Sequence, residues 1–184
     1  MGIKASLEGV KIKVGQVRFF EDLPPGFHKH ADELRQKGMT VAIGEFDVVK
    51  RDLDGLPINY YVEKGYGAGA AKVFKHTPEM IRYFEDLLQV KYPWPKYDQI
   101  VVRDFVSGAM ENTTASVFME DLNVNSRELI DYNWDDIIAH ELFHQWFGDL
   151  VTCESWANLP LNESFATYGE YLWKTHKDGE QEGD

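Results

Sequence analysis

Two histidines four residues apart, His140 and His144, constrain this chain more than any other feature of its sequence. On an α-helix this spacing places both imidazoles on one face, one turn apart, where both can reach a single metal ion. Glu141 lies between them in the pentapeptide HELFH and projects beside the pair. It is therefore placed to act on a metal-bound water rather than to bind the metal.

The residues around this pentapeptide fit a helix that is buried on nearly all sides. Ile138, Leu142 and Trp146 form one apolar stripe, and a second stripe flanks the other side of the metal-binding face. We expect the helix to begin near Asn133 and to be capped at its C-terminal end by Gly148. Burying the two histidines and the glutamate without partners would be costly, and coordination of a metal removes that cost.

A hydrolytic zinc site needs a third protein ligand, and Glu163 is the candidate. It occurs in the segment LNESF, in what we expect to be a second helix over about residues 158–174. Two histidines and one glutamate around Zn²⁺, with the fourth position left to water, form the ligand set of hydrolytic zinc sites. The pentapeptide alone would fit equally well the polar face of an ordinary amphipathic helix. Further motifs are therefore needed to distinguish a metal site from such a face.

A further motif, GAMEN, spans Gly108–Asn112. Together with HELFHQWFG at His140–Gly148 and NESFA at Asn162–Ala166, it makes the chain resemble the zinc aminopeptidases of the aminopeptidase N type, members of the gluzincin clan. The resemblance covers roughly Val41–Trp173. Pro160 and Ser164 stand where Trp and Gly are common in the family, and neither position is a ligand.

The resemblance implies an α+β fold in which a mixed β-sheet packs on helices. It would be the N-terminal part of a thermolysin-like (gluzincin) catalytic domain, carrying the HExxH helix and the following ligand helix. We expect this domain over residues 41–176, after a strand and loop segment of uncertain origin (residues 1–40) and before a polar tail (residues 177–184).

The resemblance also implies a zinc-dependent aminopeptidase with one Zn²⁺ per chain and peptide substrates that have a free N-terminus. The metal ligands would be His140, His144 and Glu163, and Glu141 would act as general base. In the family, GAMEN lies on an edge strand beside the zinc cleft, where an extended peptide can add as a further strand. Glu111 would hold the free α-ammonium group. The substrate-binding residues implied in this way are Gly108, Ala109, Met110, Glu111 and Asn112.

One departure from the family concerns the tyrosine that stabilises the oxyanion, which lies well downstream of the ligand glutamate. Tyr168 and Tyr171 lie on the ligand helix and do not match that position. The chain therefore resembles a piece of a catalytic domain without its helical part, and loss of one oxyanion donor costs on the order of 10²–10³ in rate.

A non-catalytic zinc-binding fragment is the alternative, whereas GAMEN argues against an endopeptidase of the thermolysin type. An apolar face left uncovered would favour self-association or assembly with the missing helical half.

The composition of the chain argues against several other classes of function and partner. The net charge of −12 argues against nucleic acid or an anionic membrane as a partner. Cys153 is the only cysteine, so no disulfide can form within the chain and the compartment stays open. The sequence contains neither an apolar run long enough to span a membrane nor a signal peptide, so we expect a soluble chain of unknown location.

Local patterns predict the remaining elements. Thr77 should cap a helix that is stopped by Tyr92–Pro95, and the glycine-rich residues 65–71 should form a plain loop, since they lack the order of a phosphate-binding motif. Strands are expected at residues 3–19, 41–49, 58–63 and 98–105, with a turn at 52–55.

Overall fold

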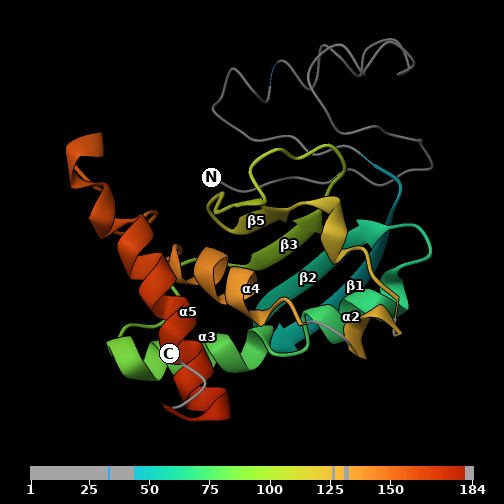
Figure 1. Ribbon diagram of the computed structural model, residues 1–184, viewed down its shortest axis with the longest axis horizontal. Helices are drawn as coiled ribbons and strands as arrows, with labels where there is room; N and C mark the ends of the chain where they lie inside the picture. Colours follow the sequence, from blue (N-terminus) through green and yellow to red (C-terminus); the bar gives the residue numbers. More distant parts are fainter. Residues whose placement is uncertain (1–32, 34–43, 126, 131–132, 181–184) are drawn as a thin grey trace.

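The computed structural model describes residue 33 and residues 44–125, 127–130 and 133–180. The strands and loop predicted for residues 1–40 fall outside this part of the chain, apart from Glu33. The described residues form a mixed β-sheet with helices packed against it (Figure 1), which confirms the predicted α+β class.

The sheet has five strands in the order β1-β2-β3-β5-β4. The β1–β2 pair is antiparallel, β2 runs parallel to β3 and β3 to β5, and β4 is antiparallel to β5 at one edge. The crossover between the parallel strands β2 and β3 contains two helices, α2 (Gly67–Val73) and α3 (Thr77–Leu88), whereas the chain passes from β3 to β5 through β4. The strand bounds are β1 Phe46–Leu53, β2 Leu56–Glu63, β3 Tyr97–Val101, β4 Ala109–Met110 and β5 Ala115–Phe118.

The predicted turn at residues 52–55 is the two-residue hairpin between β1 and β2. Asp54 and Gly55 both have positive φ, 54° and 93°, as a type I′ turn requires. The Gly55 amide donates to Oδ1 of Asp52 at 2.9 Å, and Leu53 pairs with Leu56. Strand β1 therefore continues to Leu53, beyond the end predicted at residue 49.

The glycine-rich segment predicted as a loop is instead helix α2, Gly67–Val73. Its alanines favour helix, and its glycine at position 69 allows a close approach of two backbones. A Cβ on Gly69 would lie 1.8 Å from the carbonyl oxygen of Val124, so no larger residue fits there. The loop prediction was wrong because this contact is made with a segment far along the chain.

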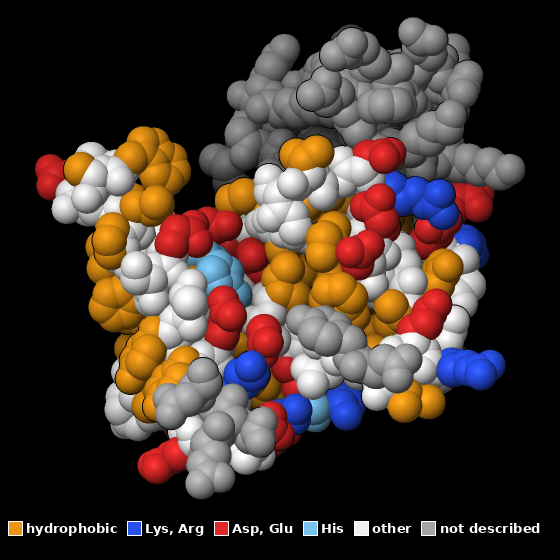
Figure 2. Space-filling view, viewed as in Figure 1, with side chains coloured by type: hydrophobic (Ala, Val, Ile, Leu, Met, Phe, Trp, Pro, Cys, Tyr) orange, Lys and Arg blue, Asp and Glu red, His pale blue; other side chains and the backbone are white. Residues whose placement is uncertain are grey.

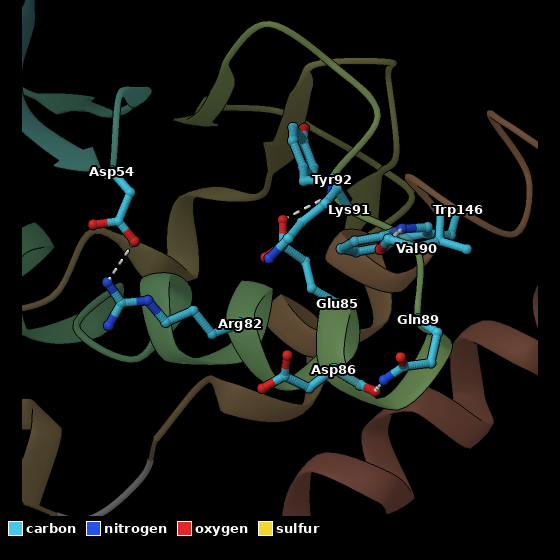
Figure 3. A network of polar contacts seen from close by, with 9 residues as sticks. All are labelled: Asp54, Arg82, Glu85, Asp86, Gln89, Val90, Lys91, Tyr92 and Trp146. Atoms are coloured by element: carbon cyan, nitrogen blue, oxygen red, sulfur yellow. Dashed lines mark hydrogen bonds and ion pairs between the residues drawn. The ribbon is translucent and has the colours of Figure 1, made fainter.

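Helix α3, Thr77–Leu88, lies where a helix was predicted, but Thr77 is not its cap. The helix is preceded by His76, and the Thr77 hydroxyl donates to Oε1 of Gln99 at 2.8 Å in the buried interior. The helix ends where Gln89 adopts a left-handed conformation with φ of 54°. Figure 3 shows the end of α3 and the segment that follows it, where Glu85 of α3 accepts hydrogen bonds from the Tyr92 amide and from Lys91.

Helix α4, Asp135–Phe143, contacts β4 on one side and α5, Glu163–Asp178, on the other (Figure 1). α5 begins later than predicted, because residues 156–161 form a 3₁₀ helix, and it ends later than predicted, since its last turns are held in place. His176 stacks on Tyr83 with ring centroids 4.1 Å apart, and Lys177 binds Asp135 at 2.9 Å. Three short 3₁₀ helices complete the described elements: η2 Glu120–Leu122, η3 Glu128–Ile130 and η4 Trp156–Leu161.

The main core lies between one face of the sheet and helices α3, α4 and α5. Phe84, Phe143 and Trp173, one from each helix, are all buried there. β3 is buried along its whole length, because Ile100 points instead into a second cluster on the opposite face. Burial of this apolar surface is the main driving force that fixes α4 and α5 relative to the sheet. No helix in the described part of the chain has the length and apolar character needed to cross a bilayer.

Candidate metal centre

The C-terminal end of α4 presents the two histidines of the pentapeptide. His140 lies in the last turn of α4, and His144 follows its final residue, with its amide still donating to the His140 carbonyl at 3.2 Å. The helical spacing is thus kept although the α-helix ends before the predicted cap. Gly148 has φ of 135°, and the next amide, that of Asp149, donates to the His144 carbonyl at 3.0 Å, closing the helix end one turn later.

Glu163 enters the same site from the first residue of α5. The residue before it, Asn162, is buried and its Oδ1 accepts the Cys153 amide at 3.1 Å, which fixes the start of the helix. α5 can lie close to α4 because Gly169 faces Phe143. A Cβ at position 169 would come within 2.7 Å of the Phe143 ring, so glycine is needed at this crossing.

The three candidate ligand atoms form a nearly equilateral triangle. The two Nε2 atoms of His140 and His144 are 3.1 Å apart, and each is 3.4 Å from Oε2 of Glu163. Ligand atoms about 2.0–2.2 Å from a tetrahedral Zn²⁺ would be about 3.3–3.6 Å from one another. The triangle is close to that size, so the three side chains fit a zinc ion.

Hydrogen bonds at the other ring nitrogens orient both histidines. Nδ1 of His140 lies 2.6 Å from Oε1 of Glu170, and Nδ1 of His144 lies 3.0 Å from the carbonyl oxygen of Phe147. Both partners accept hydrogen bonds, so each Nδ1 carries the proton and each Nε2 directs a lone pair into the triangle. At 3.1 Å the two Nε2 atoms can share either a proton or a metal ion, and together with the Glu163 carboxylate they form a donor set that suits zinc.

Glu170 is a residue of the site that the sequence analysis missed. It lies seven residues after Glu163, about two helical turns along the same face of α5, and that spacing was the available signal. Burial lowers the pKa of His140, but its hydrogen bond to Glu170 and the charges of Glu141, Glu170 and Glu163 outweigh burial and raise that pKa. The nearby carboxylates therefore favour a positive charge at the His140 imidazole.

Glu141 stands beside the triangle without being part of it. Its side chain is only 5% exposed, and its Oε2 has no hydrogen-bond partner among the described residues. Burial raises the pKa of Glu141 to about 8, with further increases from the charges of Glu111, Glu163 and Glu170 and a decrease from His140. A buried carboxyl group with an unused oxygen next to a cation site is suited to proton transfer.

The GAMEN segment forms the edge of the sheet next to α4, as the resemblance implied. Ala109 and Met110 are β4 and pair only with β5, so their other edge faces no strand in the described part of the chain. Gly108 has φ of 78°, and the carbonyl oxygen of Asn112 accepts the Ala115 amide at 2.7 Å in the turn that follows. The Glu111 carboxylate contributes to the raised pKa of Glu141, so the two charges are close enough to interact.

Figure 2 shows a histidine side chain exposed among acidic side chains beside α5, and a run of hydrophobic side chains along the flank of that helix. The large exposed hydrophobic side chains of η4 and α5 are Trp156, Leu159, Phe165 and Tyr168. Tyr168 and Tyr171 stack on each other with ring centroids 5.6 Å apart.

The sequence of this chain is similar to those of known aminopeptidases. Residues 73–183 match the model of the Peptidase family M1 domain. The chain is 38% identical to glutamyl aminopeptidase of Sus scrofa over 144 residues, which is 76% of this chain and 15% of that protein. It is 37% identical to the Homo sapiens glutamyl aminopeptidase over 140 residues, covering 73% and 15%. Identity to aminopeptidase M1-A of Oryza sativa subsp. japonica is 37% over 142 residues, covering 73% and 16%. The chain thus spans about 15% of the length of these curated relatives.

Proposed function

Because the chain belongs to peptidase family M1, a family of metallopeptidases, we propose that it carries the metal-binding part of a zinc-dependent aminopeptidase. Its relatives named glutamyl aminopeptidase and aminopeptidase M1-A support a peptide with a free N-terminus as the substrate class. The observation that carries the proposal is the triangle of His140, His144 and Glu163 with both Nδ1 atoms already committed. Residues 41–176 would then belong to a thermolysin-like catalytic domain.

One Zn²⁺ per chain would be held by His140, His144 and Glu163. When bound, the ion supplies Lewis-acid chemistry, polarising the scissile carbonyl and making a nearby water more acidic. Glu170 would hold the His140 ring in the tautomer that binds metal, and the Phe147 carbonyl would do the same for His144.

Glu141 would move the proton. Its carboxylate takes one proton from the attacking water as the water oxygen bonds to the carbonyl carbon, and it then gives that proton to the peptide nitrogen as the C–N bond breaks. The products are a free amino acid and a shortened peptide. The burial of Glu141 and its unpartnered Oε2 support this role, since the carboxylate has no competing partner among the described residues.

Glu111 would select the peptide end. Main-chain groups of Gly108–Met110 on the open edge of β4 can pair with an extended substrate, and Asn112 ends that segment. A carboxylate fixed at position 111 then faces the α-ammonium group, which an internal peptide bond does not have. This arrangement favours removal of the N-terminal residue.

Hydrolysis of amino-acid anilides by the zinc-loaded chain tests the proposal. We expect the wild type to cleave anilides with a free amine and not their N-acetylated forms. Glu141→Gln should keep zinc and lose on the order of 10²–10⁴ in rate, while Glu79→Gln on the exposed start of α3 should keep both. Full activity of the zinc-loaded Glu141→Gln variant would contradict the assignment.

A second candidate function is metal binding without turnover. The chain spans about 15% of the length of its relatives, so groups that complete the active site can lie in the remainder of those proteins. Bound zinc with no hydrolysis of any anilide would favour this candidate, and it would favour assembly with a further polypeptide over independent catalysis.

A further inference from the structure

We propose that Gln145 is a positioning residue that fixes Glu111 relative to the metal centre and thereby maintains the preference for a free N-terminus. The inference rests on the proposed function, in which Glu111 binds the α-ammonium group. Gln145 follows the ligand His144 directly and is fully buried, so its carboxamide cannot exchange partners with solvent.

The Gln145 carboxamide bridges the two ends of the turn that carries Glu111. Its Nε2 donates to the Glu111 carbonyl oxygen at 3.0 Å, and its Oε1 accepts the Thr114 amide at 2.8 Å. Both bonds have ordinary lengths and both are to backbone, so they hold the chain rather than a side chain. A shift of the turn would break both hydrogen bonds, of which the one to the Thr114 amide is buried and the one to the Glu111 carbonyl is partly buried.

The turn needs this support because its backbone is strained. Thr114 has φ of 71°, which is unfavourable for a β-branched residue and persists only where surrounding contacts enforce it. The Ala115 amide bonds to the Asn112 carbonyl at 2.7 Å, closing the turn on its inner side. Gln145 supplies the contact that holds Thr114 from the side of α4.

Gln145 is itself held from the opposite side, by the segment after α3. The Tyr92 hydroxyl lies 3.2 Å from Oε1 of Gln145 and 3.2 Å from the Lys96 carbonyl oxygen, and Trp94 donates from Nε1 to the Gln145 carbonyl at 3.0 Å. The next residue, Trp146, donates from Nε1 to the Val90 carbonyl at 3.2 Å, and Figure 3 shows Tyr92, Val90 and Trp146 in this arrangement. The glutamine is thus a rigid link between the amine-binding turn and the metal ligand beside it.

The length of that link matters to the chemistry. In an α-amino acid the ammonium group and the scissile carbonyl are separated by one carbon atom, so the amine anchor and the metal must lie at one fixed separation. Displacement of an anchor by about 1 Å can cost on the order of 10²-fold in rate. Loss of the Gln145 link is therefore expected to weaken recognition of the amine more than binding of zinc.

The test compares peptide binding by the zinc-loaded full chain and its variants. The probe is a fluorescently labelled tetrapeptide with a free N-terminus, alongside its N-acetylated form, and the readout is the ratio of their dissociation constants by fluorescence anisotropy. We expect a ratio of about tenfold or more for the wild type, since one tenfold step corresponds to a single charge-assisted contact. The Glu111→Gln variant gives the baseline, which is the ratio of the two dissociation constants when no carboxylate at position 111 binds the amine.

Gln145→Met keeps the length of the side chain and removes both hydrogen bonds, and it should lower the ratio at least threefold with zinc still at one per chain. The matched control is Gln99→Met, at a second fully buried glutamine, on β3, whose Oε1 accepts from Thr77. It should lose thermal stability to a similar extent but keep the wild-type ratio. If Gln145→Met does not fold, Gln145→Glu keeps the acceptor for Thr114, loses the donor to Glu111 and should lower the ratio as well.

The outcomes separate the inference from the proposed function. No preference for the free amine in the wild type would refute the role of Glu111 and, with it, the inference. A normal wild-type preference that survives in the folded Gln145 variant would overturn the inference alone. An equal fall in Gln145→Met and Gln99→Met, or a fall that follows loss of zinc, would show a general structural effect and would also overturn it.

Discussion

The Nε2 atoms of His140 and His144 face each other at 3.1 Å, and each ring is turned that way by a hydrogen bond at its Nδ1. At this distance the two nitrogens can share a proton or bind one metal ion. With the carboxylate of Glu163, which comes from a separate helix, they would form the ligand set proposed for zinc.

Removal of the Glu170 carboxylate should weaken zinc binding without removing a ligand. Glu170→Gln loses the charge that holds the His140 ring, and partners of this kind typically contribute 10–100-fold to metal affinity. Competition with a chelator of known affinity measures the change. Asp178→Asn, an exposed acid at the end of the same helix, should leave the affinity within about twofold, and an unchanged affinity in Glu170→Gln would show that the carboxylate does not support the metal site.

A side chain at the crossing of α4 and α5 should separate the two halves of the site. Gly169→Val places atoms where Phe143 already lies, and such overpacking costs roughly 1–3 kcal/mol of unfolding free energy. Because Glu163 is on α5 and the histidines are on or directly after α4, zinc affinity should fall together with stability. Urea unfolding and zinc titration measure both; Thr167→Ala, on the exposed side of α5, is the control. Unchanged zinc affinity in Gly169→Val would contradict the close packing.

The ion pair between Lys177 and Asp135 should give a pH-dependent contribution to stability. Burial lowers the pKa of Lys177, but its hydrogen bond to Asp135 and the nearby carboxylates outweigh burial and raise that pKa above the ordinary value. A raised pKa in the folded state means that the contribution is present below the unfolded value and is lost as the pH rises through the folded value.

Lys177→Met should therefore be less stable than wild type at pH 8, by roughly 1 kcal/mol after allowance for solvent screening, and the difference should shrink above pH ~11. Urea unfolding of the metal-free proteins at both pH values measures it. Lys174→Met removes a longer and more exposed pair with Asp136 at 3.6 Å and should have a smaller effect at pH 8. A difference that grows with pH would contradict the sign.

The exposed hydrophobic side chains of η4 and α5, which are Trp156, Leu159, Phe165 and Tyr168, should promote self-association. Trp156 is 81% exposed and Phe165 is 42% exposed, which is unusual for large apolar side chains. Light scattering should report an average mass that rises with concentration for the wild type and a smaller rise for Trp156→Ser with Phe165→Ser. A wild type that remains monomeric over the whole concentration range would contradict this expectation.

Local sequence patterns predicted much of the site, because its chemistry depends on short spacings. The placement of His140 and His144 follows from the helical repeat, and the Glu163 side chain lies beside them as expected. The edge position of GAMEN came from the resemblance rather than from the residues themselves, and pairing of Ala109 and Met110 with β5 alone agrees with it.

The parts that were missed depend on contacts between distant segments. Gly69 belongs to a helix because it packs on the Val124 carbonyl, and no local pattern contains that contact. Thr77 donates to Gln99 instead of capping α3 for the same reason. Glu170 and Gln145 act through partners on other elements, so their roles become visible only once α4, α5 and the GAMEN turn are packed together.

Zinc content by elemental analysis, after exposure to excess metal and dialysis at neutral pH, tests the metal centre most directly. The wild type should retain one zinc per chain, Glu163→Ala should retain much less, and Glu79→Ala should match the wild type. Absence of zinc from the folded wild type, or equal zinc in wild type and Glu163→Ala, would contradict the assignment of His140, His144 and Glu163 as the ligands.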